Sequence, residues 1–189
     1  GKDYSKTVRV SFLIEGNRSL KKFAQAVATG QITAEGQILV RDLAATPSND
    51  LTPRTYVERI TQLIKGHKIR MKVLDEKQIA QEKMGGLIGV AKGSIEPPRF
   101  VILEYNGASA SQKPIVLVGK GVTFDAGGIS IKPAADMHEM KGDMTGSAVV
   151  IASIIAASRL KLPLNIVTLT PLTENMPSGT ALKPGDVLT

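Results

Sequence analysis

Cysteine is absent from the 189 residues of this chain, which excludes disulfide bonds and zinc sites built from thiolates. A chain without cysteine is compatible with a reducing cytoplasm. Aromatic residues make up only 4% of the sequence, so the core should consist mainly of Ile, Leu, Val, Ala and Met. Hydrophobic residues reach 42%, enough for a packed domain, and a disordered chain is therefore excluded.

Long hydrophobic runs are scarce as well. The longest strongly apolar stretch, residues 149–157, is far shorter than the roughly 20 residues that a membrane span requires. Residues 1–7 are charged and polar, and they lack the apolar segment of a secretory signal. We therefore expect neither a membrane-spanning segment nor a signal peptide.

Two common nucleotide-binding motifs are missing. A phosphate-binding loop requires G-x-x-x-x-G-K followed by Ser or Thr, but Lys120 is followed by Gly121, and the first glycine of the motif is missing from its required upstream position. No G-x-G-x-x-G opens a helix, which excludes the dinucleotide fingerprint. The net charge of +7 would suit nucleic acid, but the basic residues are scattered and no aromatic platform accompanies them. Nucleic-acid binding is kept only as an alternative.

Turn residues and hydrophobic spacing divide the first half of the chain into short elements. Thr52 should cap a helix that has Pro53 at its first position and stops at Gly66. Residues 69–73 alternate between apolar and charged, as in a half-exposed strand near a sheet edge. The other predicted elements are a strand over 8–14 with a turn at 16–17, helices over 20–28, 34–45 and 76–83, and a loop over 46–50.

Three continuous apolar runs, residues 100–103, 115–118 and 166–169, are typical of strands that are covered on both faces. Residues 145–160 should form a helix between the last two runs, so these strands should be parallel and joined by a right-handed crossover. The predicted fold is therefore α/β, a mostly parallel mixed sheet flanked by helices on both faces in three α/β/α layers.

Charged side chains gather where the strand over 115–118 ends. Lys120 and Asp125 belong to the loop expected over 119–128, directly after this strand. Lys132 comes a few residues later, and Asp143 precedes the next helix. Ligands of open α/β sheets bind at the carboxyl ends of the strands. Two carboxylates and two amines at this end of the sheet favour a cation over a phosphate as the ligand.

Long motifs surround these charged residues. They are VGKGVTFDAGGISIKP, MHEMKGDMTGSA and PLTENMPSGTALKPGDV, with RDLAATPSNDLTP and LIGVAKGS...PPRFVILEYNG upstream. Together they resemble the leucine aminopeptidase family, also called cytosol aminopeptidases. The resemblance makes residues 34–189 the N-terminal part of the metallopeptidase catalytic domain, and residues 1–33 the end of an N-terminal domain and its connecting region.

The resemblance implies two divalent metal ions, Mn²⁺ or Zn²⁺, which activate water. Lys120, Asp125 and Asp143 match metal ligands of the family, and Asp125 matches the carboxylate that bridges both ions. Lys132 matches a catalytic lysine that stabilises the substrate oxyanion, and Met140 matches a residue that lines the pocket for the N-terminal side chain. Lys120 would bind the metal as a neutral amine, whereas Lys132 would stay protonated.

The function implied by the resemblance is the release of N-terminal, leucine-type amino acids from peptides by a cytoplasmic homohexamer, with bicarbonate as general base. The family's Asn-Thr-Asp-Ala-Glu-Gly-Arg segment, which supplies two further ligands and the bicarbonate-binding arginine, does not occur in these residues. We therefore expect a sheet that is incomplete at its C-terminal end and a chain that is inactive alone. A nucleic-acid-binding or non-catalytic assembly module of the same family is the alternative function.

Other polar residues near these motifs are not expected to take part in the chemistry. His67 and His138 are not expected to bind metal, and the loop over 174–186 should be structural, shaped by its prolines and glycines. Three charged residues are expected to be ordinary surface groups: Asp136, Glu139 and Lys141.

Overall fold

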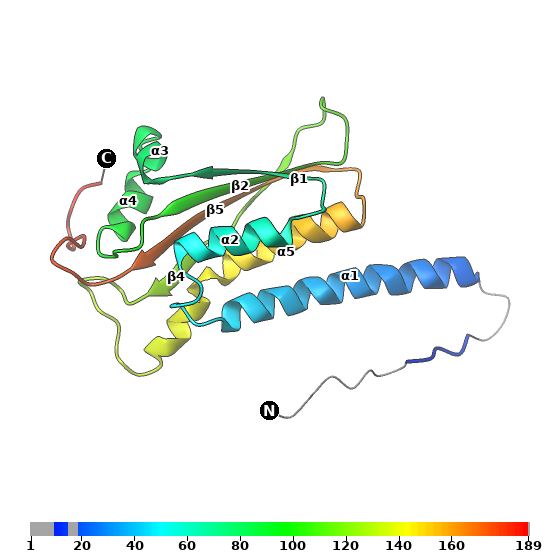
Figure 1. The fold of residues 1–189 in the computed structure, drawn as a ribbon, viewed down its shortest axis with the longest axis horizontal. Coiled ribbons are helices and arrows are strands. Elements are labelled where there is room, and N and C mark those ends of the chain that lie inside the picture. The colour runs from blue at the N-terminus through cyan, green and yellow to red at the C-terminus, as the bar shows by residue number, and fades with distance from the viewer. Residues whose placement is uncertain (1–9, 15–18, 189) are drawn as a thin grey trace.

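The computed structural model describes residues 10–14 and 19–188, which contain a five-stranded sheet and its covering helices (Figure 1). The helices are α1 (Leu20–Ala45), α2 (Pro53–Leu63), α3 (Glu76–Gln81), α4 (Gly85–Ala91), the 3₁₀ helix η1 (Met137–Met144) and α5 (Thr145–Arg159). The strands are β1 (Ile69–Leu74), β2 (Arg99–Asn106), β3 (Ile115–Val118), β4 (Gly121–Asp125) and β5 (Asn165–Asn175).

The strands follow the order β1-β2-β5-β3, and β4 also pairs with β5. The β1–β2 and β2–β5 pairs are antiparallel, whereas β3 and β4 are both parallel to β5. All strands except β2 therefore run in one direction, and the prediction of a mostly parallel mixed sheet is confirmed. Strand β3 pairs with the first half of β5 and β4 with its last residues, so together they form one interrupted strand along the sheet edge.

The main core lies between the sheet and helices α2 and α5. Val101, Leu103 and Tyr105 alternate along β2 and are buried on this face, against Ile60 of α2 and Ile151 of α5. Helix α1 packs against α5 on the side away from the sheet, and the short helices α3 and α4 lie beyond the strands on the opposite side (Figure 1). Helices therefore flank both faces, as predicted.

Several elements were predicted correctly. Thr52 accepts a hydrogen bond from the Thr55 amide and caps α2, and Gly66 follows this helix with a φ of +82°. Strand β1 lies at the sheet edge with alternating exposure, and α5 joins β3 to its parallel neighbour β5. Hydrophobic spacing and capping residues were sufficient for these elements.

The N-terminal predictions need correction. The two helices expected over 20–28 and 34–45 form one continuous helix, because α1 starts at the Ser19 cap and runs through Gly30. Its alanine-rich first half favours helix, and its second half packs on α5. Residues 10–14 form no strand, while residues 8 and 9 and the turn expected at 16–17 lie outside the described residues.

The sequence analysis also missed α4 and β4, and its prediction that β3 is buried on both faces was wrong. Residues 121–125 were expected to be a loop but continue the β3 edge as β4. Strand β3 was expected to be covered on both faces, yet Val116 is 52% and Val118 70% exposed. Exposure arises because β3 lies at an edge of the described sheet and only one of its faces meets α5.

One segment of the described chain, Met137–Arg159, is long and apolar enough to cross a membrane by length and composition. It consists of η1 and α5, and half of its most apolar window is buried inside the protein. Its hydrophobic residues include Ile151, Ile154 and Ile155, which belong to the core. This burial is what a core helix of a folded domain requires.

Candidate metal centre

The predicted site residues come together beside β4, near the carboxyl ends of β4 and β5. Asp125 is the last residue of β4, and Lys120 lies in the interruption between β3 and β4. Helix η1 packs against β4 and carries Met140 and Asp143, while Lys132 belongs to the loop between β4 and η1. The topology therefore brings all five predicted residues to one region.

Close packing of α5 fixes the position of Lys120. The Ser147 amide donates a 2.8 Å hydrogen bond to the Lys120 carbonyl oxygen. A Cβ atom on Gly119 would lie 2.5 Å from the Gly146 carbonyl oxygen, and one on Gly146 would lie 3.0 Å from the Lys120 nitrogen. The two glycines thus let the helix start approach the strand directly. Lys120 Nζ then lies 2.5 Å from Asp143 Oδ2.

Asp125 is held by three donors. Its Oδ2 atom lies 2.8 Å from Lys132 Nζ, while Oδ1 accepts hydrogen bonds from the Gly127 amide at 3.0 Å and from Asn175 Nδ2 at 2.8 Å. Burial by itself would raise the pKa of Asp125, but these hydrogen bonds and the charge of Lys132 lower it below the ordinary value of 3.8. Asp125 is therefore ionised at neutral pH.

Lys132 connects the two halves of the cluster. Its hydrogen bond to Asp125 raises the pKa of Lys132 above the ordinary value of 10.5; burial opposes this, and the negative charges of Asp125 and Asp143 add to it. Lys132 Nζ also lies 3.4 Å from Met140 Sδ. Lys132 is therefore an ammonium group at neutral pH, and Asp143 acts electrostatically on it as well as pairing with Lys120.

The donor atoms of this cluster suit a divalent cation. Asp143 Oδ2 is buried and has no hydrogen-bond partner among the described residues, although Lys120 Nζ is close. Within the described ranges no three His, Asp or Glu side chains come together, so Asp125 and Asp143 supply the carboxylates. Carboxylate oxygens bind Mn²⁺ well, and a lysine nitrogen can add a donor once it has lost its proton. This set of donors fits one metal ion and leaves coordination positions on that ion for solvent or substrate.

Sequence reasoning missed Asn175. Residues 174–186 were expected to form a structural loop, but Glu174 and Asn175 end β5, and the Asn175 amide contacts a candidate metal ligand. Asn175 lies directly opposite Asp125 in the parallel ladder, a register that cannot be inferred without recognising β4. The His138 side chain is 72% exposed, and its Nε2 atom lies 3.2 Å from Glu139 Oε1.

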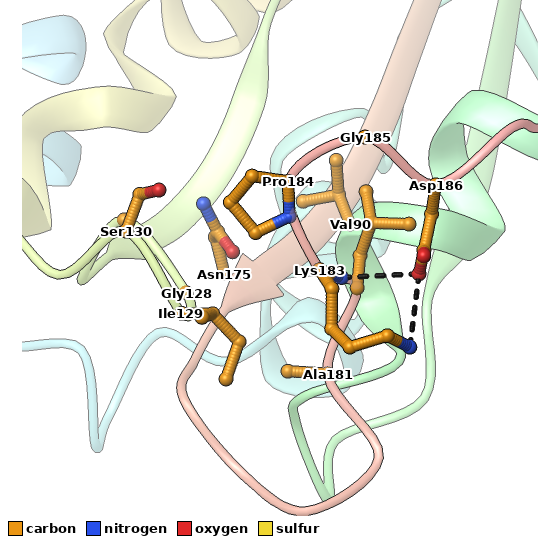
Figure 2. Close-up of a pocket in the computed structure, with 12 residues that line it drawn as sticks. Val90, Gly128, Ile129, Ser130, Asn175, Ala181, Lys183, Pro184, Gly185 and Asp186 are labelled. Atoms are coloured by element: carbon orange, nitrogen blue, oxygen red, sulfur yellow. Dashed lines mark hydrogen bonds and ion pairs between the residues drawn. The ribbon is translucent and has the colours of Figure 1, made fainter.

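A cavity of about 310 Å³ borders this centre. Figure 2 shows Gly128, Ile129 and Ser130 on one side of it and the segment from Lys183 to Asp186 on the other, with Asn175 between them. The Lys183 amide and ammonium both contact Asp186 Oδ2, which closes the second wall. Because Asn175 lines this cavity and also binds Asp125, the cavity adjoins the metal centre.

Comparison with known families places these residues in context. Residues 38–189 match the family described as the cytosol aminopeptidase family, catalytic domain. A probable cytosol aminopeptidase of Cupriavidus pinatubonensis is 47% identical over 183 residues, which cover 97% of this chain and 36% of that protein. One of Aromatoleum aromaticum is 49% identical over 164 residues, covering 87% of this chain and 33% of that protein. The chain thus spans about a third of the length of these relatives.

Solved structures of related enzymes are also similar to this chain. The bottromycin maturation enzyme BotP in complex with Mn has a TM-score of 0.82 and 43% sequence identity, with 87% of this chain and 36% of that chain covered. The apo leucyl aminopeptidase from Trypanosoma cruzi has a TM-score of 0.81 and 31% identity, with 86% of this chain and 32% of that chain covered. Both structures therefore share the fold of the described residues.

Proposed function

Because this chain belongs to the cytosol aminopeptidase family, we propose that it is part of a metal-dependent aminopeptidase that releases N-terminal residues from peptides. The single observation that carries the proposal is the cluster of two carboxylates and two lysines beside β4. Similarity to the bottromycin maturation enzyme BotP in complex with Mn supports the use of a divalent metal.

Each residue of the cluster has a role in this proposal. Asp125 and Asp143 provide anionic oxygens for the metal, and Lys120 provides a nitrogen after losing its proton. When bound, divalent cations would supply Lewis acidity and an activated water. Lys132 keeps its proton and donates a hydrogen bond to the carbonyl oxygen of the scissile peptide as that oxygen gains negative charge. Met140 contacts Lys132 and lines the space for the substrate side chain.

For the whole aminopeptidase of which we propose this chain to be a part, the proposal includes further properties. There we propose a pair of ions, Mn²⁺ or Zn²⁺, with bicarbonate as general base, in a cytoplasmic hexamer that prefers leucine-type residues. Within the described residues only Asp125 and Asp143 bring carboxylates to the centre. Two carboxylates are too few ligands for two ions. We therefore propose that this chain binds a cation but does not turn over peptides by itself. The proposed division into residues 1–33 and 34–189 falls within the continuous helix α1.

The metal centre is tested by titrating Mn²⁺ into the purified chain and into three variants, with the heat of binding as the readout. Asp125→Asn and Asp143→Asn should each weaken binding by more than about tenfold, since even an outer-sphere partner usually costs that much. Asp136→Asn is the matched control, because this exposed carboxylate lies nearby and its left-handed backbone (φ 58°) tolerates Asn. Equal affinities for all four proteins would refute the proposed centre.

Activity is a separate measurement. The chain should not hydrolyse leucine p-nitroanilide in the presence of Mn²⁺ or Zn²⁺, because too few ligands hold the ions. Turnover above the rate of a sample that carries Asp125→Asn would contradict the proposed inactivity but not the metal centre itself.

A further inference from the structure

We infer that Asn175 is a positioning residue, which turns the carboxylate of Asp125 so that one oxygen faces the metal centre. The inference rests on the proposed function and deepens it, because Asn175 itself is not a proposed ligand. Asp125 ends β4 and Asn175 ends β5, and the two residues are direct partners in the parallel ladder. The Ala126 amide also donates a 2.9 Å hydrogen bond to the Asn175 carbonyl oxygen, so the two strand ends are joined beyond the ladder.

The two oxygens of Asp125 have different surroundings. Oδ1 accepts both the Asn175 side-chain amide at 2.8 Å and the Gly127 backbone amide at 3.0 Å. Oδ2 accepts neither of these hydrogen bonds. It lies 2.8 Å from Lys132 Nζ, within the candidate metal centre. A carboxylate can rotate freely about its Cβ–Cγ bond unless donors hold it. Two donors on Oδ1 oppose this rotation, and they keep Oδ2 directed at the cation site.

The position of the Asn175 amide depends in turn on Gly128. Gly128 has a φ of +69°, a conformation that L side chains rarely adopt. A Cβ atom added there would lie 2.8 Å from Asn175 Oδ1, too close for ordinary contact. The Gly127 amide is therefore one donor to Asp125. The absence of a side chain at Gly128 leaves room for Asn175, which supplies the other donor.

This arrangement separates orientation from charge. Asn175 is neutral, so it fixes Asp125 without adding a further charge to the two carboxylates and two lysines of the cluster. Partners of this kind, which hold a ligand without touching the metal, typically change metal affinity by 10–100-fold when removed. The same size of effect is expected for Asn175.

The test compares Mn²⁺ dissociation constants of the full 189-residue chain and its variants by calorimetry. Asn175→Leu keeps the branched shape of the side chain but removes the donor, and it should weaken binding about tenfold. Gly128→Ala keeps the amide but displaces it, and it should weaken binding in the same direction. Asn175→Gln retains a donor and should bind more tightly than Asn175→Leu. Asn106→Leu, an exposed amide at the end of β2, should leave binding unchanged.

Melting curves without metal separate positioning from folding, since a purely structural role would lower stability and leave the affinity of the folded protein intact. If Asn175→Leu does not fold, Gly128→Ala and Asn175→Gln carry the comparison. Folded variants that bind Mn²⁺ as tightly as the unaltered chain would overturn the inference while the proposed function stands.

Failure of the unaltered chain to bind Mn²⁺ would instead count against the proposed function. The role of Asn175 is then decided by crystal structures of the metal-free chain and of Asn175→Leu. An Asp125 carboxylate that turns away from Lys132 in the variant supports the inference, and an unchanged orientation overturns it.

Discussion

Two tyrosines of the core, Tyr56 and Tyr105, differ in what their hydroxyl groups meet. Tyr105 is 4% exposed, and its hydroxyl donates a 2.9 Å hydrogen bond to the Leu162 carbonyl oxygen. Tyr56 is fully buried, and its hydroxyl has no hydrogen-bond partner among the described residues, although the Ser147 hydroxyl is near. Burial raises the pKa of Tyr56, an effect that Ser147 only partly offsets, so the hydroxyl stays protonated.

Replacing each tyrosine with phenylalanine should therefore have different effects on the free energy of unfolding. Tyr56→Phe should leave it unchanged or raise it by up to about 1 kcal/mol, because a buried polar group without a partner is removed. Tyr105→Phe should lower it by about 1 kcal/mol, because the Leu162 carbonyl loses its donor. Urea denaturation measures both values. A larger loss for Tyr56→Phe than for Tyr105→Phe would contradict this account.

At the residue scale, the sequence predicted which charged groups meet but not what holds them. Lys120, Asp125, Lys132 and Asp143 stand in long motifs at the end of an apolar run, so their convergence follows from the rule for α/β sheets. Asn175 carries no such signal. Its contact with Asp125 depends on the pairing of β4 with β5, a long-range register that local patterns do not encode.

Helix α1 is tied to α5 by an ion pair. Arg159 Nη2 lies 2.5 Å from Glu35 Oε2, and Gln31 donates a 2.8 Å hydrogen bond to Glu35 Oε1. The hydrogen bond from Gln31 lowers the pKa of Glu35 most, and the hydrogen bond and charge of Arg159 add to this against a small opposing effect of burial. The pair therefore stabilises the ionised form of Glu35 in the folded protein.

Glu35→Gln should lower the melting temperature at neutral pH. Because the folded-state pKa lies below the ordinary value of 4.5, the contribution of the pair is present above that pH and is lost as the pH falls through the lowered pKa. The difference between variant and unaltered chain should therefore disappear on acidification, and it should shrink at high salt. Glu58→Gln is the control, since its partner Arg54 lies on the same helix at 3.6 Å. A difference that persists in acid would contradict this assignment.

At the element scale, prediction succeeded where local signals agreed and failed where packing overrode them. Thr52 and Pro53 marked the start of α2 because capping is a local interaction. Helix α4 escaped prediction because Gly85, Gly86 and Gly89 all disfavour helix, and its contacts with β5 supply what propensity lacks. Two helices were expected where α1 is continuous; Gly30 lies inside α1, and a glycine in a helix costs only about 1 kcal/mol.

The whole molecule has two unlike sheet edges. At one edge, β1 carries Arg70 and Lys72 on its more exposed face, and such charges discourage pairing with another strand. At the other edge, β3 has no charged residue and exposes Ile115, Val116 and Val118. Apolar, uncharged edges promote association between copies of a protein. The exposed apolar edge of the described sheet is therefore β3.

We expect the isolated chain to self-associate through β3. Val118→Lys should reduce this association by placing a charge on the edge, and sedimentation velocity over a concentration series measures the change. Ile95→Lys is the matched control, because Ile95 is fully exposed but lies in the turn before β2. Equal effects of both substitutions would mean that general surface hydrophobicity, and not the sheet edge, drives association.

The interlocked glycines at positions 119 and 146 have a consequence for how this family can evolve. Each leaves room for the backbone of the other segment, so a methyl group at either one pushes the start of α5 away from the strand that it covers. Lys120 belongs to the first of these segments, directly after Gly119, and Asp143 lies just before the start of α5. A lineage that gains a side chain at one of the two positions should therefore also lose the spacing between this lysine and this aspartate, which we propose as metal ligands.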